Sequence, residues 1–182
     1  MIRTINKLSL LCAVWITALG GIAARADEAP EYQVKAAFLY NFAKFVEWPA
    51  DALPQDSSPF VIGVLGDDPF GANLDKTVEG KALGEHKIVA KRFKKLEDVQ
   101  TCHILFVCRS EKDKLSKIVE RLGKANTLVV GDTDQLLQRG GAINFTLEDK
   151  KVRFEINADA AERADLKVSS KLMQLATKVI HR

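Results

Sequence analysis

The sequence predicts an α/β domain whose mostly parallel sheet is flanked by helices on both faces, with a C-terminal antiparallel hairpin. Short apolar runs alternate with amphipathic segments through residues 60–138, and this alternation favours parallel strands joined by helical crossovers. Gly140 and Gly141 then break the chain before two apolar runs, 142–147 and 152–156, which a Glu-Asp-Lys turn joins. Two such runs around a short polar turn indicate a hairpin.

The individual elements follow from hydrophobic period and from helix boundaries. Residues 31–48 form the clearest helix, with an apolar stripe at helical spacing and Pro49 directly after it. The other expected elements are strands at 60–65, 87–93, 103–108 and 127–130, and helices up to 78, at 111–122, up to 138 and at 160–164. Asn157 or Asp159 is expected to cap the helix at 160–164. A last helix from Ser169 or Ser170 is expected to bury Leu172, Leu175, Ala176 and Val179.

The sequence opens with an export signal. Arg3 and Lys7 precede the apolar stretch 8–24, and Ala24-Arg25-Ala26 is a small-x-small cleavage signal. The stretch is short for a membrane-spanning helix, which needs about 20 apolar residues. We therefore expect a cleaved signal peptide over residues 1–26. A single domain over 27–182 would remain in the periplasm, with no insertion into the membrane.

Charge and cysteine content exclude several classes of protein. The chain has 27 Lys and Arg against 24 Asp and Glu, but three of the basic residues and no acidic residue lie in segment 1–26. The expected mature chain is therefore balanced, which gives no electrostatic basis for binding nucleic acid or anionic lipid. Cys102 and Cys108 lie at opposite ends of one predicted strand, about 20 Å apart, beyond the reach of a disulfide. We expect both to be buried strand residues.

Polar residues follow three of the predicted strands. They are Gly66, Asp67 and Asp68 after the first, Arg109 and Ser110 after the third, and Gly131 and Asp132 after the fourth. Ligands of parallel sheets bind beyond the carboxyl ends of the strands, so one interpretation is a small polar ligand pocket at this edge. The other interpretation is helix capping, in which short oxygen-bearing side chains accept the free N–H groups of the following helix.

Motifs for catalysis and for cofactors are weak. The Gly66 to Gly71 spacing resembles a phosphate loop, but Ala72 and Asn73 replace the lysine and hydroxyl residue that such a loop requires. No histidine has a second metal ligand at usable spacing. A Ser–Lys dyad at Ser170 and Lys171 competes with helix capping and a solvated lysine. We therefore expect neither an enzyme nor a cofactor or metal.

Long motifs in the chain resemble the YfiR-like family of periplasmic proteins. These motifs are Glu31–Pro49 (EYQVKAAFLYNFAKFVEWP), Leu65–Gly71, Gly140–Phe145, Val152–Asn157 and Ala161–Leu172. The resemblance implies an α/β domain that often forms homodimers. It also implies that the partner is the periplasmic sensor region of an inner-membrane diguanylate cyclase, which is held inactive so that cyclic-di-GMP and biofilm growth are kept low.

One departure from the family pattern concerns redox control. Some relatives carry a disulfide near the late hairpin, whereas residues 142–157 of this chain contain no cysteine. Redox switching through such a bridge therefore does not transfer to this protein.

Partner binding is assigned to two groups of residues. The first is Glu162, Arg163, Leu166 and Val168, and the second is Tyr40 with Trp48, which are expected to be exposed. Mixed charge beside apolar and aromatic side chains is typical of interfaces. The alternative is a solvated helix face for the charged pair and a core position for the others. A periplasmic small-ligand sensor that uses the strand-end pocket is the competing function.

Overall fold

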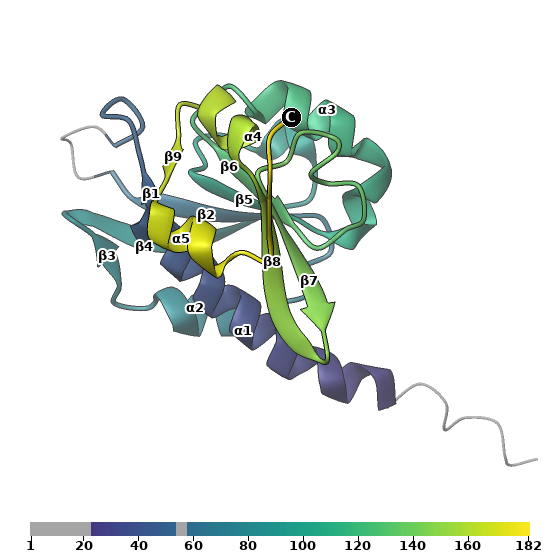
Figure 1. The fold of residues 1–182 in the computed structure, drawn as a ribbon. Helices are drawn as coiled ribbons and strands as arrows, with labels where there is room; N and C mark the ends of the chain where they lie inside the picture. Colours follow the sequence, from purple (N-terminus) through teal and green to yellow (C-terminus); the bar gives the residue numbers. More distant parts are fainter. Residues whose placement is uncertain (1–22, 54–57) are drawn as a thin grey trace, which may run out of the picture.

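Residues 23–53 and 58–182 are described by a computed structural model of the protein, which has the predicted α/β fold (Figure 1). Its main sheet has eight strands in the order β10-β8-β7-β6-β5-β2-β4-β3. The strands are β2 (Phe60–Leu65), β3 (Ala82–Leu83), β4 (His86–Phe93), β5 (Ile104–Val107), β6 (Leu128–Gly131), β7 (Ile143–Glu148), β8 (Lys151–Asn157) and β10 (Lys178–Ile180). Neighbours from β4 to β7 run parallel, and β7 with β8 forms the predicted antiparallel hairpin.

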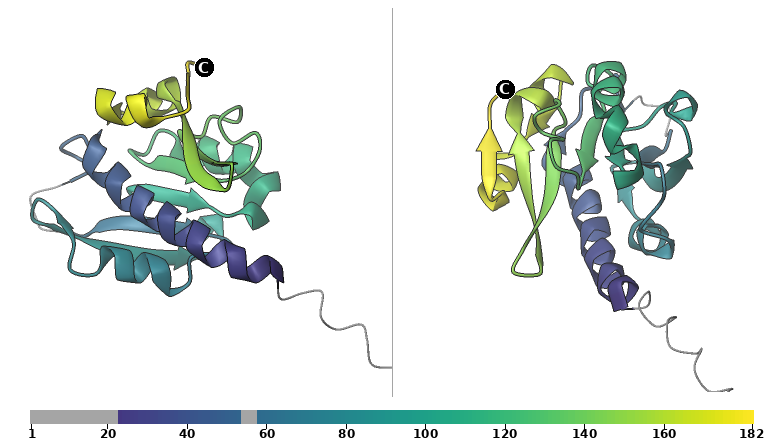
Figure 2. Two further views of the ribbon diagram at one scale, coloured as in Figure 1. Left: turned by 60° about the horizontal axis from the view of Figure 1, so that its bottom comes forward. Right: turned by 90° about the vertical axis from the view of Figure 1, so that its right-hand side faces the viewer.

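Helices cover both faces of this sheet. They are α1 (Ala23–Phe45), α2 (Ala72–Val78), α3 (Leu115–Leu122), α4 (Ala158–Arg163) and α5 (Ser170–Leu175), with short 3-10 helices η1 (Leu96–Asp98) and η2 (Arg109–Lys114). The helices α1 and α2 lie on one face and α3 on the other (Figure 2). No helix among residues 23–53 and 58–182 is long and apolar enough to cross a membrane. Residues 1–22 of the predicted signal peptide lie outside the described part of the chain.

Each central strand supplies side chains to two hydrophobic cores. Ile104 and Phe106 of β5 pack in the core beneath α1 and α2, whereas Leu105 and Val107 pack in the core beneath α3. Successive side chains of a strand point to opposite faces, so a strand covered on both sides is apolar at every position. This explains why the central strands appear in the sequence as continuous apolar runs.

The first helix is shorter at its C-terminus than predicted. It ends at Phe45 instead of Trp48, and β1 (Val46–Glu47) follows as a short strand paired antiparallel with β9 (Lys167–Val168). The carbonyl of Phe45 accepts the Ser169 N–H at 3.0 Å. The backbone after Phe45 is therefore engaged by a segment more than a hundred residues away in sequence, and this tertiary pairing overrides the local helical pattern.

The prediction was also wrong at two places later in the chain. Residues 134–140 form turns instead of a helix, with Gln135 in the left-handed region (φ 71°). The last helix, which Ser169 caps, ends at Leu175. Leu175 is 58% exposed, and the Thr177 N–H bonds the Phe154 carbonyl of β8 at 2.9 Å. Val179 therefore lies in the strand β10, which pairs with the free edge of β8, instead of in the predicted helix.

Candidate functional site

Charged side chains gather where β5 and β6 end, beneath the N-terminal part of α1. Lys35 of α1 places its Nζ 2.6 Å from Oδ2 of Asp132, which directly follows β6. Tyr32 donates its hydroxyl to the same oxygen at 2.7 Å. Arg109, which follows β5, lies 3.3 Å from it through Nη2. Glu31 pairs with Lys35 and lies 3.9 Å from Arg109. We call these five residues the Asp132 cluster.

Burial makes the pairing within the Asp132 cluster energetically important. Lys35 is 1% exposed and the side chain of Asp132 is 2% exposed. A charge removed from water is tolerated only when opposite charges and hydrogen bonds compensate for its lost hydration. Glu31 and Asp132 supply that compensation for Lys35. The cluster therefore fixes the N-terminal part of α1 to the carboxyl edge of the sheet.

The protonation of the cluster follows from the same geometry. Burial raises the pKa of the Tyr32 phenol, and the hydrogen bond to Asp132 and the charge of Asp132 raise it further. Burial by itself would lower the pKa of Arg109, but Asp132 leads the anionic neighbours that raise it overall. At neutral pH Tyr32 is thus a neutral donor to Asp132, and Arg109 is a cation at the margin of the cluster.

A polar cavity of about 280 Å³ opens beside Asp132. Its polar lining comes from Lys35, Arg109, Asp132, Asp134, Asn144 and Thr146. The strands β6 and β7 pair only at Val130–Ile143 and Gly131–Asn144, after which β7 continues along β8 as the projecting hairpin (Figures 1 and 2). The cavity lies where the two strands part.

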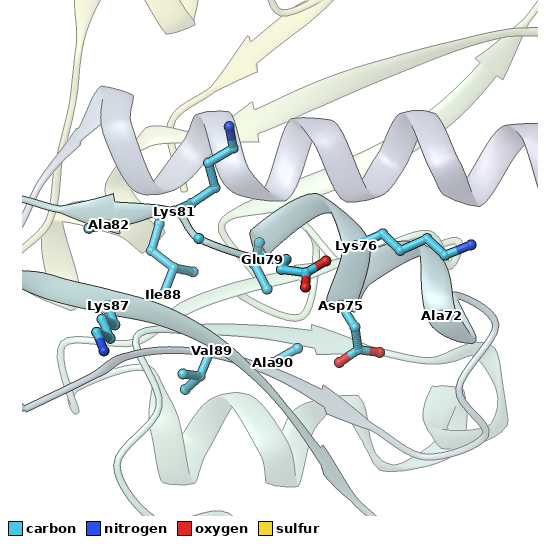
Figure 3. A pocket seen from close by; sticks show the side chains of 12 residues that line it. Ala72, Asp75, Lys76, Glu79, Lys81, Ala82, Lys87, Ile88, Val89 and Ala90 are labelled. Carbon is cyan, nitrogen blue, oxygen red and sulfur yellow. The ribbon is translucent and has the colours of Figure 1, made fainter.

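A larger groove of about 740 Å³ lies beside β3 and β4, which are the last two strands on one side of the sheet. It is formed between α2 and this strand pair (Figure 3). Apolar residues such as Val78 and Ile88 line it together with charged residues of both signs. Arg92 binds both carboxylate oxygens of Asp75 at 2.6 Å, and this hydrogen bonding lowers the pKa of Asp75. The acid is therefore an ion-pair partner of Arg92. The smaller cavity is lined by the buried ion pair of Lys35 and Asp132, so we consider it the better candidate for a functional site.

The structure brings Gly66, Asp67 and Ser110 of the predicted strand-end pocket together but leaves them outside the cavity beside Asp132. Asp68 accepts the Phe70 N–H through Oδ1 at 2.7 Å and pairs with Arg92 through Oδ2 at 3.0 Å. The Asp67 N–H donates to Ser110 Oγ at 3.0 Å. Gly66 lies so near Ser110 that a Cβ would come 2.4 Å from its hydroxyl oxygen.

Of the six predicted pocket residues, only Asp132 lines the polar cavity, and Gly131 precedes it as the last residue of β6. Asp132 does not cap a helix either, because turns follow it. Lys35, Asn144 and Thr146 were missed, whereas Arg109 was among the residues noted after the third predicted strand. Only Asn144 and Thr146 carried a sequence signal, because they are polar residues that alternate with apolar ones in the predicted strand.

The residues predicted to bind a partner occupy different environments. Glu162 and Arg163 are exposed on α4, and Arg163 donates to the Arg182 carbonyl at 2.6 Å. Leu166 is 1% exposed and belongs to the core, and Val168 is half-buried in β9. Their part in partner binding stays a prediction.

Tyr40 and Trp48 are half-buried instead of exposed. Trp48 donates its indole N–H to the Ala43 carbonyl at 3.0 Å. Its ring packs edge-on against that of Phe60, with 5.0 Å between the ring centroids. The ammonium groups of Lys44 and Lys81 lie 5.5 and 6.0 Å from the Tyr40 ring. The apolar parts of both aromatic side chains are therefore packed against the core, which limits their surface available to a partner.

Other candidate chemistry has structural explanations. Ser169 accepts the Leu172 N–H at 3.3 Å as the cap of α5, and the Lys171 ammonium lies 5.2 Å from the Phe45 ring. Cys102 and Cys108 are free, and both are buried as predicted, although they flank β5 instead of lying within it. Within the part of the chain that the structure describes, no group of three or more His, Cys, Asp or Glu residues could hold a metal ion.

These features define an α/β domain whose most distinctive polar site is a buried ion-pair cluster beside a small cavity. The chain belongs to the YfiR/HmsC-like family, whose model matches residues 32–177. The family consists of periplasmic regulators connected with cyclic-di-GMP signalling, so a regulatory role follows at the level of the family. No curated protein sequence matches the chain.

Solved structures resemble the chain in fold. A conserved domain protein from Vibrio cholerae has a TM-score of 0.54 and 14% identity. An ABC domain in complex with L-Trp from Streptococcus pneumoniae has a TM-score of 0.52 and 9% identity. In both cases the match covers 80% of this chain and 60% of the other. At this identity the likeness concerns the fold alone.

Proposed function

We propose that this protein is a periplasmic repressor, which as a homodimer binds the periplasmic sensor region of an inner-membrane diguanylate cyclase and lowers cyclic-di-GMP signalling. The observation that carries the proposal is the family match over residues 32–177, which spans nearly the whole described domain. A regulator of this kind acts through a binding surface and needs no catalytic group.

The contact surface is centred on α4. Glu162 and Arg163 present opposite charges to solvent, and Asn157 caps the helix by accepting the Ala160 N–H at 3.2 Å. The chain turns after the helix, where the Leu166 N–H bonds the Ala161 carbonyl at 3.0 Å. Burial of the Leu166 side chain anchors this turn. Residues Glu162 and Arg163 would therefore contact the partner directly, while Leu166 would hold them in position.

The adjoining β1–β9 ribbon extends this surface. Val168 pairs with Val46 in the ribbon and is half-buried. A preordered surface loses less conformational entropy on binding. Such rigidity suits a protein that must hold another in one state.

Titration calorimetry with the purified sensor region tests the proposal. The Glu162→Lys variant should weaken binding by about tenfold or more, while its melting temperature stays unchanged because the residue is exposed. Glu85→Lys is the matched control, since Glu85 is an exposed residue between β3 and β4 at the other end of the sheet. Equal affinity of the two variants would reject α4 as the contact surface. A native protein that forms no complex would reject the proposed function.

A deletion strain provides the cellular test. Loss of the protein should raise cyclic-di-GMP, and the full sequence should restore the low level while a form lacking residues 1–26 should not. An unchanged cyclic-di-GMP level after deletion would contradict repression of a cyclase. Restoration by the form without residues 1–26 would contradict the periplasmic site of action.

A further inference from the structure

The outer edge of β4 has no partner strand along most of its length. The strand β3 pairs with β4 over two residues only, and these pairs end at Lys87. The Ile88 N–H then donates to the Lys81 carbonyl at 3.0 Å. Beyond Ile88, no described strand lies on this side of β4. Residues 89–93 therefore form an open edge of the main sheet.

The backbone groups on this open edge are those of Ala90 and Arg92. The Phe93 carbonyl accepts the N–H of Gly66, directly after β2, at 3.0 Å, so the backbone groups of Phe93 point toward β2. Successive residues of a strand direct their backbone groups to opposite neighbours, and those of Ala90 and Arg92 therefore point outward. No hydrogen bond with a described residue engages their N–H or C=O groups. Such an edge is a template for pairing with another extended chain.

The groove of about 740 Å³ opens onto this edge. Val89 and Ala90 line it together with the buried side chains of Val78 and Ile88. Ile88 and Ala90 lie on the face of the sheet that α2 covers, because both pack in the core beneath α1 and α2. The groove is thus apolar next to the open edge, and α2 forms one of its walls (Figure 3). A strand added to β4 would place every second side chain against this apolar surface.

Lysines without ion-pair partners determine the charge of the site. Four exposed lysines lie in or beside the groove and form no ion pair with a described residue: Lys76, Lys81, Lys87 and Lys91. Of the two acids in the lining, Asp75 is already paired with Arg92. Glu79 is then the acid that can offset the lysines, so positive charge is in excess. An acidic segment would neutralise this excess.

The same lysines decide between two kinds of occupant. A second copy of this chain that paired edge to edge would bring its own Lys87 and Lys91 to the interface, and like charges on neighbouring strands are destabilising. Lysine on an edge strand is a feature that proteins use against such self-association. An acidic segment would instead meet opposite charges while its backbone pairs with Ala90 and Arg92. The charge therefore favours an acidic partner segment over a second copy.

We propose that the open edge of β4 binds an extended acidic segment of a partner protein, which pairs with Ala90 and Arg92 as an added strand. Small apolar residues of the segment would lie beside Ile88 and Ala90, on the face that α2 covers. Its acidic residues would lie on the other face, beside Lys87 and Lys91. The site is far in the strand order from β8, which α4 follows. This binding activity is therefore separate from the proposed repressor surface on α4.

Nuclear magnetic resonance of the ¹⁵N-labelled protein tests the proposal with the peptide acetyl-EVEVE-amide, which alternates acidic and apolar residues. In the free protein the amides of Ala90 and Arg92 should exchange with solvent quickly, whereas those of Val89 and Lys91, which point toward β2, should be protected. The peptide should shift the Ala90 and Arg92 signals and slow their exchange, with a dissociation constant of roughly a millimolar or below. Unchanged signals for both amides would overturn the site.

Two control peptides separate the role of the backbone from the role of charge. Acetyl-KVKVK-amide keeps the backbone and reverses the charge. A form of the EVEVE peptide with a methyl group on every backbone nitrogen keeps the side chains and removes the N–H donors. Both should bind at least about tenfold more weakly than the EVEVE peptide. Equal affinity of the methylated peptide would overturn strand addition, and equal affinity of the basic peptide would overturn the selection of acidic segments.

Variants of the protein locate the binding on the β4 edge. Lys87→Glu combined with Lys91→Glu reverses the charge of the edge and should weaken binding of the EVEVE peptide at least about tenfold. Lys112→Glu with Lys124→Glu is the matched control, because it changes the net charge equally at exposed positions away from the groove. Ala90→Pro removes an N–H that the fold itself does not use, and should abolish binding.

Unfolding curves show which variants fold. The variant of Lys87 and Lys91 is changed only at exposed positions, so it tests the proposal even where Ala90→Pro does not fold. Peptide affinity that stays the same in this folded variant as in the control of Lys112 and Lys124 would refute the proposal.

Discussion

Replacing Lys35 with methionine would remove the central positive charge of the Asp132 cluster while keeping an unbranched side chain of similar length. Asp132, with a side chain 2% exposed, would then retain the Tyr32 hydroxyl and the partly exposed Arg109 guanidinium. Removing one partner of a buried ion pair costs about 3–5 kcal/mol, because the remaining charge loses its compensation. Arg109 offsets part of this loss, so we expect the free energy of unfolding to fall by about 3 kcal/mol.

Urea unfolding followed by circular dichroism measures this loss as a lower midpoint at constant slope. Lys44→Met on the same helix is the control, and its exposed position predicts a change within about 0.5 kcal/mol. A double-mutant cycle with Asp132→Asn isolates the pairing. The double variant should lose at least about 1.5 kcal/mol less than the sum of the single losses. Additive losses, or a loss below about 1 kcal/mol for Lys35→Met, would refute the inferred dependence of Asp132 on Lys35.

Three further predictions concern buried groups outside the cluster. Burial raises the pKa values of Cys102 and Cys108 from 9.0 to about 12, so their protonated forms stabilise the fold below pH 9. This stability should be lost between pH 9 and 12, by up to about 1.4 kcal/mol per pH unit for each thiol; a flat urea midpoint over that range would contradict it. Burial lowers the pKa of His103 below 6.5, and its Nδ1 accepts the Val61 N–H at 3.0 Å. The free energy of unfolding should therefore fall as the pH drops below 6.5, because the unfolded chain binds the proton more readily. An NMR titration that gives a pKa above 6.5 in the folded protein would disprove this. Asn157→Ala should lower the free energy of unfolding in urea by about 2–4 kcal/mol, because this fully buried side chain makes two hydrogen bonds to the backbone. A loss under about 1 kcal/mol would show that other groups replace these hydrogen bonds.

The sequence by itself determined the features that depend on local pattern. Continuous apolar runs identified the strands covered on both faces, and alternation identified the β7–β8 hairpin. Asn157 or Asp159 was expected to cap one helix, and Ser169 or Ser170 was expected to begin the last one. Asn157 and Ser169 are the caps, and each accepts the N–H three residues ahead. The burial of Cys102 and Cys108 followed from the apolar run between them. These properties arise within one element, where the period of side chains and the free N–H groups of a helix end act over a few residues.

Only the tertiary structure decided how distant segments meet. Lys35 looked like an ordinary helix lysine, and it became a buried ion-pair partner because the sheet order brings Asp132, 97 residues away, beneath α1. The strand β10 forms because the edge of β8 is free to pair with it. The sequence of residues 178–180 contains no local pattern that predicts this pairing. The polar cavity likewise depends on where β6 and β7 part. Hydrogen bonds and ion pairs between distant residues depend on strand order and register, and those are set by packing of the whole domain instead of by neighbouring residues in the chain.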